Sequence, residues 1–217
     1  MTRREVITLL EKKEYDALVR LSFSERKIFS ILISLSYDKK NPVSWRAIES
    51  IGLITKETAK TNPELVRNIA GRLLWMIRDE SGGIGWSSPE ILGEIVRNNP
   101  EFCSDIAPII VSFHEEEMLS AGVLKAVGRI GMINTEFIEY AVPVVLSYLH
   151  NPNPVLRGFA AWSLGEIGTA ESLNELRKLI NDNNVLLFYE DGELREKTVG
   201  EIAAKSIARL INKLSLH

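Results

Sequence analysis

Residues 158–167 read GFAAWSLGEI, and three earlier segments share this layout: WRAIESIGLI at 45–54, WSSPEILGEI at 86–95 and AGVLKAVGRI at 121–130. Each segment has a glycine at its eighth position and an isoleucine at its tenth. The glycines are separated by 41, 35 and 37 residues and are Gly52, Gly93, Gly128 and Gly165. Such intervals are typical of helical repeats, in which one helix pair cannot bury its apolar face alone and stacks on its neighbours. The sequence therefore predicts an array of helix pairs.

Apolar residues at helical spacing, together with capping residues, place these helices along the chain. Residues 1–40 predict two or three helices, one of them capped at its N-terminus by Ser24. The predicted pairs are 44–54 with 63–79, 87–98 with 102–114, 119–130 with 136–149 and 154–167 with 172–181. A last helix is expected at 193–212, where a weaker copy of the repeated segment occurs.

The part of the chain from Phe137 to Ile167 shows one repeat in full. It contains a helix with an internal Pro143, an Asn-Pro-rich turn at 151–154 and then Arg157, and Pro108 stands 35 residues before Pro143. This pattern resembles the HEAT repeat, in particular the HEAT-like repeats of phycobilin-lyase type, and the resemblance extends over about residues 44–210.

The resemblance implies an all-α fold, a right-handed α-α superhelix of the HEAT-like or armadillo type with about five helix pairs. It also implies that the glycine-bearing helices line the concave face. We expect residues 1–217 to form a single α-solenoid domain, with capping helices at 1–43, HEAT-like repeats at 44–192 and a C-terminal capping helix at 193–217.

One segment interrupts the helical pattern. Residues 185–189 form a strand-like apolar run that ends in an Asp191-Gly192 turn. We expect a packed loop here, and a binding loop is the alternative, because insertions between helices often carry function.

The composition is that of a globular protein, with 45% hydrophobic and 25% charged residues. No apolar run reaches the roughly 20 residues that span a bilayer, and residues 1–13 lack a signal-peptide core. We therefore expect a cytoplasmic location and no membrane partner. The single cysteine, Cys103, lies in an apolar stretch and is expected to be a buried, inert thiol.

Charge is distributed unevenly along the chain. Residues 1–46 carry ten Lys or Arg and six Asp or Glu, whereas residues 79–117 carry one Arg and nine acidic residues. The acidic stretch favours a basic protein or peptide as partner, although a charge run is also common on a plain solvated face.

Aligning the repeats on their glycines reveals a charged column. Three positions before the glycine the residues are Glu49, Glu90, Lys125 and Trp162, and one position after it they include Glu94, Arg129 and Glu166. These two positions are neighbours on one face of a helix. The charged members indicate a solvent-facing column, so Trp162 becomes a candidate exposed anchor for a partner. The alternative is that residues 185–189 cover the indole.

A glycine-rich loop forms a second candidate. Asp79, Glu80, Gly82 and Gly83 connect two predicted helices, and Trp75 and Trp86 flank them. The simplest interpretation is a helix C-cap with a tight turn that the two tryptophans staple to the core. The acidic residues disfavour phosphate binding, and they provide too few ligands for a cation.

Catalytic and metal-binding patterns are missing from the sequence. The histidines are His114, His150 and His217, and His114 alone is followed by a glutamate, whereas HEAT-like iron hydroxylases carry repeated His-Glu pairs. No zinc spacing or nucleophile-base arrangement occurs. We predict no cofactor, no metal and no catalytic residue.

The favoured function is a non-catalytic scaffold or adaptor that binds a protein or peptide on its concave face. The predicted contact residues are Trp162, Glu166, Lys125, Arg129, Glu90, Glu94 and Trp86. One alternative is a base-repair enzyme resembling the alkylation-repeat DNA glycosylases, but the acidic stretch disfavours nucleic acid as a partner. A second alternative, a chromophore-lyase-like subunit, rests on the repeat family alone.

Overall fold

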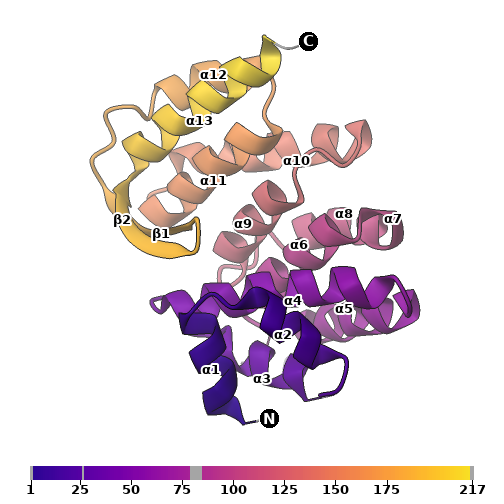
Figure 1. Cartoon of the computed structure of the whole chain (residues 1–217). Coiled ribbons are helices and arrows are strands. Elements are labelled where there is room, and N and C mark those ends of the chain that lie inside the picture. Colours follow the sequence, from indigo (N-terminus) through magenta and orange to yellow (C-terminus); the bar gives the residue numbers. More distant parts are fainter. Residues whose placement is uncertain (1, 26, 79–84, 216–217) are drawn as a thin grey trace. The chain divides into compact units, whose positions relative to one another are not determined.

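The glycine of each repeated segment lies within a helix, as the repeat spacing predicts. The computed structural model describes residues 2–25, 27–78 and 85–215, and Figure 1 shows the order of its elements. The glycine-bearing helices are α4 (Pro42–Ala59), α6 (Ser88–Asn98), α9 (Ser120–Ile130) and α11 (Pro154–Ile167). Contacts divide the chain into unit 1, formed by Met1–Ser104 and Tyr189–Leu194, and unit 2, formed by Asp105–Phe188 and Arg195–His217.

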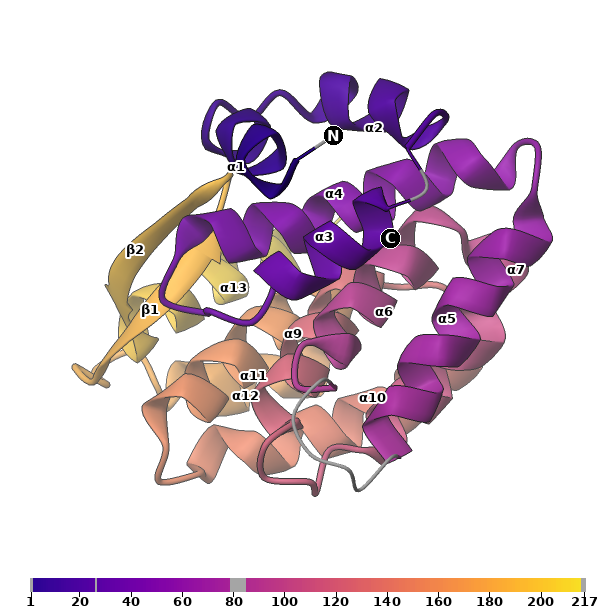
Figure 2. The same cartoon turned by 90° about the horizontal axis from the view of Figure 1, so that it is seen from below.

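Unit 1 is built around α4. This helix packs against α1 (Arg3–Glu11), α2 (Tyr15–Ser22), α3 (Ile28–Leu35), α5 (Pro63–Arg78) and α6, and the short α7 (Pro100–Cys103) packs on α5 and α6 (Figure 2). The three helices before α4 agree with the prediction for residues 1–40. Ser24 does not cap α3, which begins at Ile28, and its hydroxyl donates to the carbonyl oxygen of Leu21 instead. The core of this unit is apolar and includes Val6, Leu10, Leu18, Leu32, Ile48, Ile51, Val66, Leu73 and the buried Cys103.

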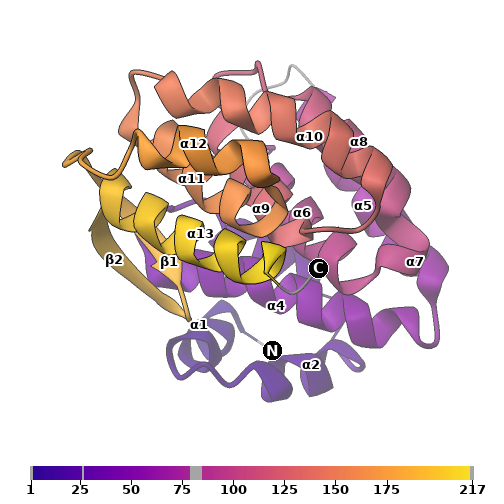
Figure 3. The ribbon, with the colours of Figure 1, turned by 90° about the horizontal axis from the view of Figure 1, so that it is seen from above.

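Unit 2 repeats the same alternation of helices. It contains α8 (Ala107–Ser112), α9, α10 (Thr135–Ser147), α11, α12 (Ala170–Arg177) and α13 (Val199–Leu214), with short 3-10 turns at Ser104–Ile106 and Tyr148–His150. Helix α11 lies between α9 and α13, and Figure 3 shows α12 and α13 side by side, as their contacts require. None of the described helices is long and apolar enough to cross a bilayer.

The repeated glycines allow successive helices to approach closely. A Cβ atom on Gly52 of α4 would lie 2.9 Å from Cβ of Glu94 on α6. A Cβ on Gly165 of α11 would lie 2.8 Å from Cβ of Ser206 on α13. Real Cβ contacts are longer, so a larger residue at either position would push the two helices apart. The glycine period is therefore the period of helix stacking within each unit.

The segment that interrupts the helical pattern is a β-hairpin. The strand-like run and its Asp191-Gly192 turn are confirmed, whereas the expected loop is corrected to a pair of strands. Strand β1 (Val185–Glu190) pairs with β2 (Glu193–Thr198) across the two residues Asp191 and Gly192, whose φ angles are +53° and +77°. Positive φ at both positions is the requirement of a type I′ turn, which Asp-Gly satisfies. Burial alternates from Val185 to Phe188, with Leu186 and Phe188 inward, and the next residue, Tyr189, is buried as well.

The last helix starts six residues later than the repeat alignment suggests. Residues 193–198 are strand, and α13 begins at Val199 because Thr198 forms a capping box with Glu201. The Thr198 hydroxyl accepts from the Glu201 amide at 3.0 Å, and the Glu201 carboxylate accepts from the Thr198 amide at 2.7 Å. The predicted helix at 193–212, and with it the C-terminal capping helix at 193–217, is corrected to 199–214.

Candidate protein-binding surface

The charged column that the sequence places on a solvent-facing surface is largely buried. Glu90 and Lys125 each keep 5% of their surface exposed, and Glu94 keeps 3%. Trp162 and Glu49 are half-buried. The expectation that this column faces solvent is therefore wrong. Other side chains of the protein contact these residues, and the kind of contact differs between the two units.

In unit 1, Glu90 is paired with a lysine from the segment before α4. Lys39 Nζ lies 2.5 Å from Glu90 Oε1 and 4.8 Å from the centroid of the Trp45 ring. A buried carboxylate is tolerated when it is paired in this way. Glu94 lies against Gly52 at the crossing of α4 and α6. Glu90 and Glu94 therefore pack inside unit 1 and do not form an exposed acidic face.

In unit 2, Lys125 and Trp162 belong to an aromatic box. Lys125 Nζ lies 3.9 Å from the centroid of Trp162, 4.5 Å from that of Phe188 and 5.7 Å from that of Phe159. Phe188 is on β1 and packs edge-on against Trp162, with ring centroids 6.0 Å apart. The hairpin therefore covers part of the indole, as the alternative interpretation of the sequence predicts. Trp162 is a packing residue and not a freely exposed anchor.

Glu166 is also engaged inside unit 2. Its carboxylate forms an ion pair with Arg209 of α13, and its carbonyl oxygen accepts from Lys213 Nζ. Burial, followed by the nearby Arg209 charge, lowers the pKa of Lys213. Arg129, the remaining charged candidate in this unit, is half-buried. These contacts attach α13 to the C-terminal end of α11.

Two tryptophans of unit 1 show the opposite behaviour. Trp75 near the end of α5 is 65% exposed, and Trp86 just before α6 is 52% exposed. The prediction that both staple their turn to the core is therefore wrong. Gly85 lies close to α5, since an added Cβ would lie 2.7 Å from the carbonyl oxygen of Met76. Trp75 precedes Met76 and Trp86 follows Gly85, so each tryptophan adjoins one of the two residues in this contact.

Helix geometry explains why Trp75 points away from the core. The buried residues of α5 are Val66, Ala70 and Leu73, and at 100° per residue Trp75 lies about 200° from Leu73. One turn earlier on this outer face are Gly71, which has open space beside it, and Arg72, which is exposed. We call Gly71, Arg72, Trp75 and Trp86 the tryptophan surface.

The architecture agrees with the comparisons with known proteins. Residues 106–187 match the family of HEAT repeats. This part of the chain consists of HEAT-like repeats. Proteins of this fold commonly act as scaffolds for protein interaction and are typically non-enzymatic. The matched residues run from before α8 into β1, and all belong to unit 2.

Two solved structures align with nearly the whole chain. The crystal structure of an engineered protein aligns over 98% of this chain and 98% of its own, with 13% identity and a TM-score of 0.55. The archaeal HEAT-like repeats protein from Thermococcus onnurineus NA1 aligns over 98% of this chain and 81% of its own, with 13% identity and a TM-score of 0.44. No curated protein matches the sequence. At such identity, the first likeness shows the fold alone.

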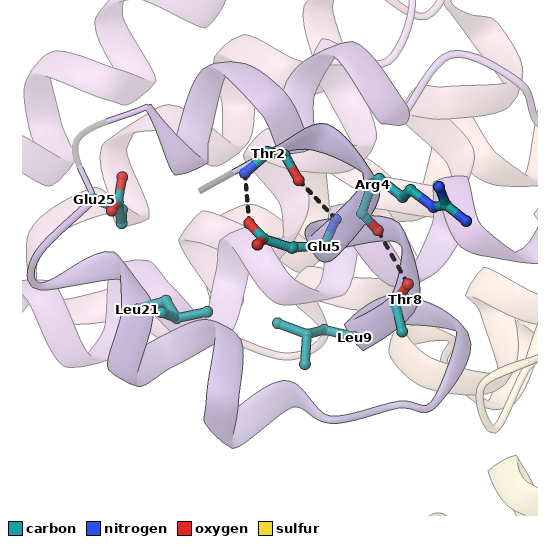
Figure 4. A pocket seen from close by; sticks show the side chains of 7 residues that line it. All are labelled: Thr2, Arg4, Glu5, Thr8, Leu9, Leu21 and Glu25. Atoms are coloured by element: carbon teal, nitrogen blue, oxygen red, sulfur yellow. Dashed lines mark hydrogen bonds between the residues drawn. The ribbon is translucent and has the colours of Figure 1, made fainter.

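A pocket of about 750 Å³ opens between α1 and the end of α2 (Figure 4). Its lining residues are Thr2, Arg4, Glu5, Thr8, Leu9, Leu21 and Glu25. Figure 4 shows Leu9 and Leu21 directed toward one another. The Glu5 carboxylate accepts from the Thr2 amide at 2.6 Å, which lowers the pKa of Glu5. The carboxylate therefore caps α1.

Two further candidates concern the loop and a metal site. Asp79, Glu80, Gly82 and Gly83 lie outside the residues that the structure describes. Among the residues that are described, no group of three His, Cys, Asp or Glu side chains is placed to hold a metal ion.

Proposed function

We propose that this protein is a non-catalytic scaffold and that it binds another protein through the tryptophan surface of unit 1. The observation that carries the proposal is the exposure of Trp75 and Trp86, at 65% and 52%. Tryptophan is strongly enriched among the residues that dominate binding energy at protein interfaces. The HEAT-like repeat fold supports the same conclusion, because stacked helices present an extended surface.

The energetic argument is one of area. Burying a whole tryptophan side chain removes roughly 150–250 Å² from water, and each Å² of apolar surface contributes about 25 cal/mol. Covering the exposed part of each indole therefore provides on the order of 3 kcal/mol before the cost of association. Gly71 lies one turn before Trp75 and has no atom within 4 Å of an added Cβ, so the helix face next to Trp75 has room for a partner side chain.

This surface differs from the one that the sequence favours. The tryptophan surface includes α5, which alternates with the glycine-bearing helices α4 and α6. Of the seven predicted contact residues, Trp86 alone belongs to it. The other six can contact a partner only if the internal contacts described above rearrange. A basic partner, for example, reaches Glu90 only if the ion pair between Glu90 and Lys39 opens.

The test is a comparison of two variants. A partner is first isolated by affinity capture with the wild-type chain and its dissociation constant is measured. The double variant Trp75→Ala/Trp86→Ala is expected to weaken binding by about 100-fold, since two hot-spot residues each cost 1–2 kcal/mol or more when truncated. Its melting temperature should remain close to that of the wild type, because both indoles are exposed.

A matched control separates this site from general loss of aromatic surface. Phe23 follows α2, belongs to unit 1 and is 64% exposed. Phe23→Ala should bind the partner as the wild type does. Equal affinity of the double variant and the control would refute the tryptophan surface as the binding site. Capture of duplex DNA in place of a protein at about 100 mM salt would refute the scaffold function itself.

A further inference from the structure

The tip of the hairpin belongs to unit 1 and contacts the rest of that unit in the manner of a peptide ligand. Arg46, which keeps 7% of its surface exposed, donates from Nε to the carbonyl oxygen of Gly192 at 2.9 Å. Its Nη1 donates to the carbonyl oxygens of Leu10 and Glu11 at 3.3 and 3.2 Å. One guanidinium thus joins the hairpin turn to the end of α1, and both sets of acceptors are main-chain groups.

Tyr189 provides the second anchor of the tip. Its ring stacks on Trp45 with centroids 5.6 Å apart and an interplanar angle of 12°. Its hydroxyl donates to Glu49 Oε2 at 2.6 Å, and the Tyr15 hydroxyl donates to the same oxygen at 3.3 Å. The side chain is 4% exposed. A ring between an aromatic face and a carboxylate acceptor is a specific site for a phenol.

Charge completes the match between the tip and its site. Residues 190–193 contain Glu190, Asp191 and Glu193, whereas residues 1–46 carry four more positive than negative charges. The Glu193 carboxylate pairs with Lys13 Nζ and lies 3.5 Å from Arg46 Nη2. An acidic segment therefore occupies a basic surface, and the two are more than 140 residues apart in sequence.

We propose that Arg46, Glu49, Trp45 and Tyr15, with the end of α1, form a peptide-recognition site. Its ligand class is a peptide in which a tyrosine is followed by an acidic residue and then an Asp-Gly turn. Residues 189–193 occupy the site within the same chain, so a partner segment of the same chemistry competes with the hairpin tip. The proposal does not depend on the tryptophan surface, because the two sites share no residue.

The experiment removes the tip side chains from the site by mutation and then tests whether an added peptide binds there. The full-length variant Tyr189→Ala/Glu193→Ala removes the two tip side chains that bind it. A cyclised, fluorescent peptide of residues 185–198 should bind this variant saturably, and wild-type protein should bind at least ten times more weakly because its own tip competes at high effective concentration. Adding Glu49→Gln to the variant should weaken peptide binding about tenfold or more, since the phenol loses a charged acceptor.

Three results would overturn the proposal. One is a folded variant, as judged by circular dichroism, that binds no peptide up to about 1 mM. Another is equal binding by variant and wild type. The third is a dimer formed by exchange of hairpins, which would make a second copy of the chain the ligand.

A measurement on the wild type covers the case in which the variant does not fold. Excess peptide should reduce the hydrogen-exchange protection of residues 185–198 in the protein, because it displaces the tip. Unchanged protection at saturating peptide would contradict competition for the site.

Discussion

Gly128 of α9 lies directly beneath the indole of Trp162 on α11. A Cβ at position 128 would stand 2.7 Å from Cε3 of Trp162 and 2.8 Å from Oγ of Ser163, which itself donates to the carbonyl oxygen of Leu124. The glycine of one repeat therefore receives the large side chain of the next. This relationship gives the repeated glycine a packing role in unit 2 and sets the separation of two successive helices.

Replacing that glycine should be costly. Gly128→Ala is expected to lower the free energy of unfolding by about 1–3 kcal/mol, because the added methyl group has no space in a close-packed crossing. Urea denaturation measures the change. The matched control is Gly71→Ala in α5, where nothing lies within 4 Å of the added Cβ. The control should be stabilised by about 0.5–1 kcal/mol through helix propensity, and destabilisation of both variants alike would contradict the packing argument.

The ion pair between Arg157 and Asp182 should make unit 2 sensitive to acid. Arg157 Nε lies 2.8 Å from Asp182 Oδ2, and both side chains are 12% exposed. Burial raises the pKa of Asp182, but hydrogen bonds from Arg157 and Asn184 outweigh it, so the pKa is lower than the ordinary 3.8. Folding then favours the charged carboxylate. Its contribution is present above pH 3.8 and is lost as the pH falls through the lower pKa of the folded state.

Asp182→Asn tests this dependence. At neutral pH the variant should lose about 2 kcal/mol of stability, since a hydrogen-bonded charge partner of Arg157 is removed. As the pH falls through the lowered pKa of Asp182 in the folded state, the wild type and the variant should converge. Denaturant unfolding from pH 7 to pH 2 measures both curves, with the exposed Asp16→Asn as control. A constant gap between the wild type and Asp182→Asn over this range would show that the carboxylate charge is not responsible.

Local sequence signals were sufficient for most helices. Asn41, Asn134 and Asn153 accept main-chain hydrogen bonds at the starts of α4, α10 and α11, and prolines follow Asn41 and Asn153 directly. Such caps act within one turn and are legible in the sequence. The second strand of the hairpin is not predicted, because the repeat alignment extends a helix through residues 193–198. The capping box at Thr198, a local signal, marks the true start of α13.

The candidate site was harder to predict because burial depends on contacts between distant residues. The charge of Lys125 indicated a solvent-facing position, but Phe188, 63 residues later, covers it. The spacing of apolar residues within one helix does not indicate that a distant residue will cover it. Trp75, in contrast, could have been found from sequence, because Val66, Ala70 and Leu73 define the buried face of α5 and leave Trp75 opposite to it.

Tyr189 should give unit 1 an alkaline limit. Burial, followed by the negative charge of Glu49, raises the pKa of the Tyr189 phenol above its ordinary value of 10.0. Folding then favours the neutral phenol, whose contribution is present below pH 10 and is lost as the pH rises toward the folded-state pKa. Tyr189→Phe should cost about 1 kcal/mol at pH 7, from the hydrogen bond to Glu49. The difference from wild type should shrink above pH 10 in urea denaturation, and parallel curves up to pH 11 would contradict this.

The aromatic box around Lys125 should be stabilised by the ammonium charge as well as by packing. Lys125→Met keeps the length and flexibility of the side chain but removes its charge, and we expect a loss of about 1–2 kcal/mol, in the range of a desolvated cation–π contact. Lys197, whose Nζ lies 5.3 Å from the Phe188 centroid and which is half-buried, provides the control variant Lys197→Met, with a smaller expected loss.

A double-mutant cycle assigns this energy to the rings. Phe188→Leu alone removes the ring that lies over Trp162, and its combination with Lys125→Met should be less destabilising than the sum of the two single changes, by about 0.5–1 kcal/mol. Strict additivity would mean that Lys125 and Phe188 stabilise the hairpin independently. The hairpin would then be fixed to α9 and α11 by apolar packing alone, and the charge at position 125 would have no part in covering Trp162.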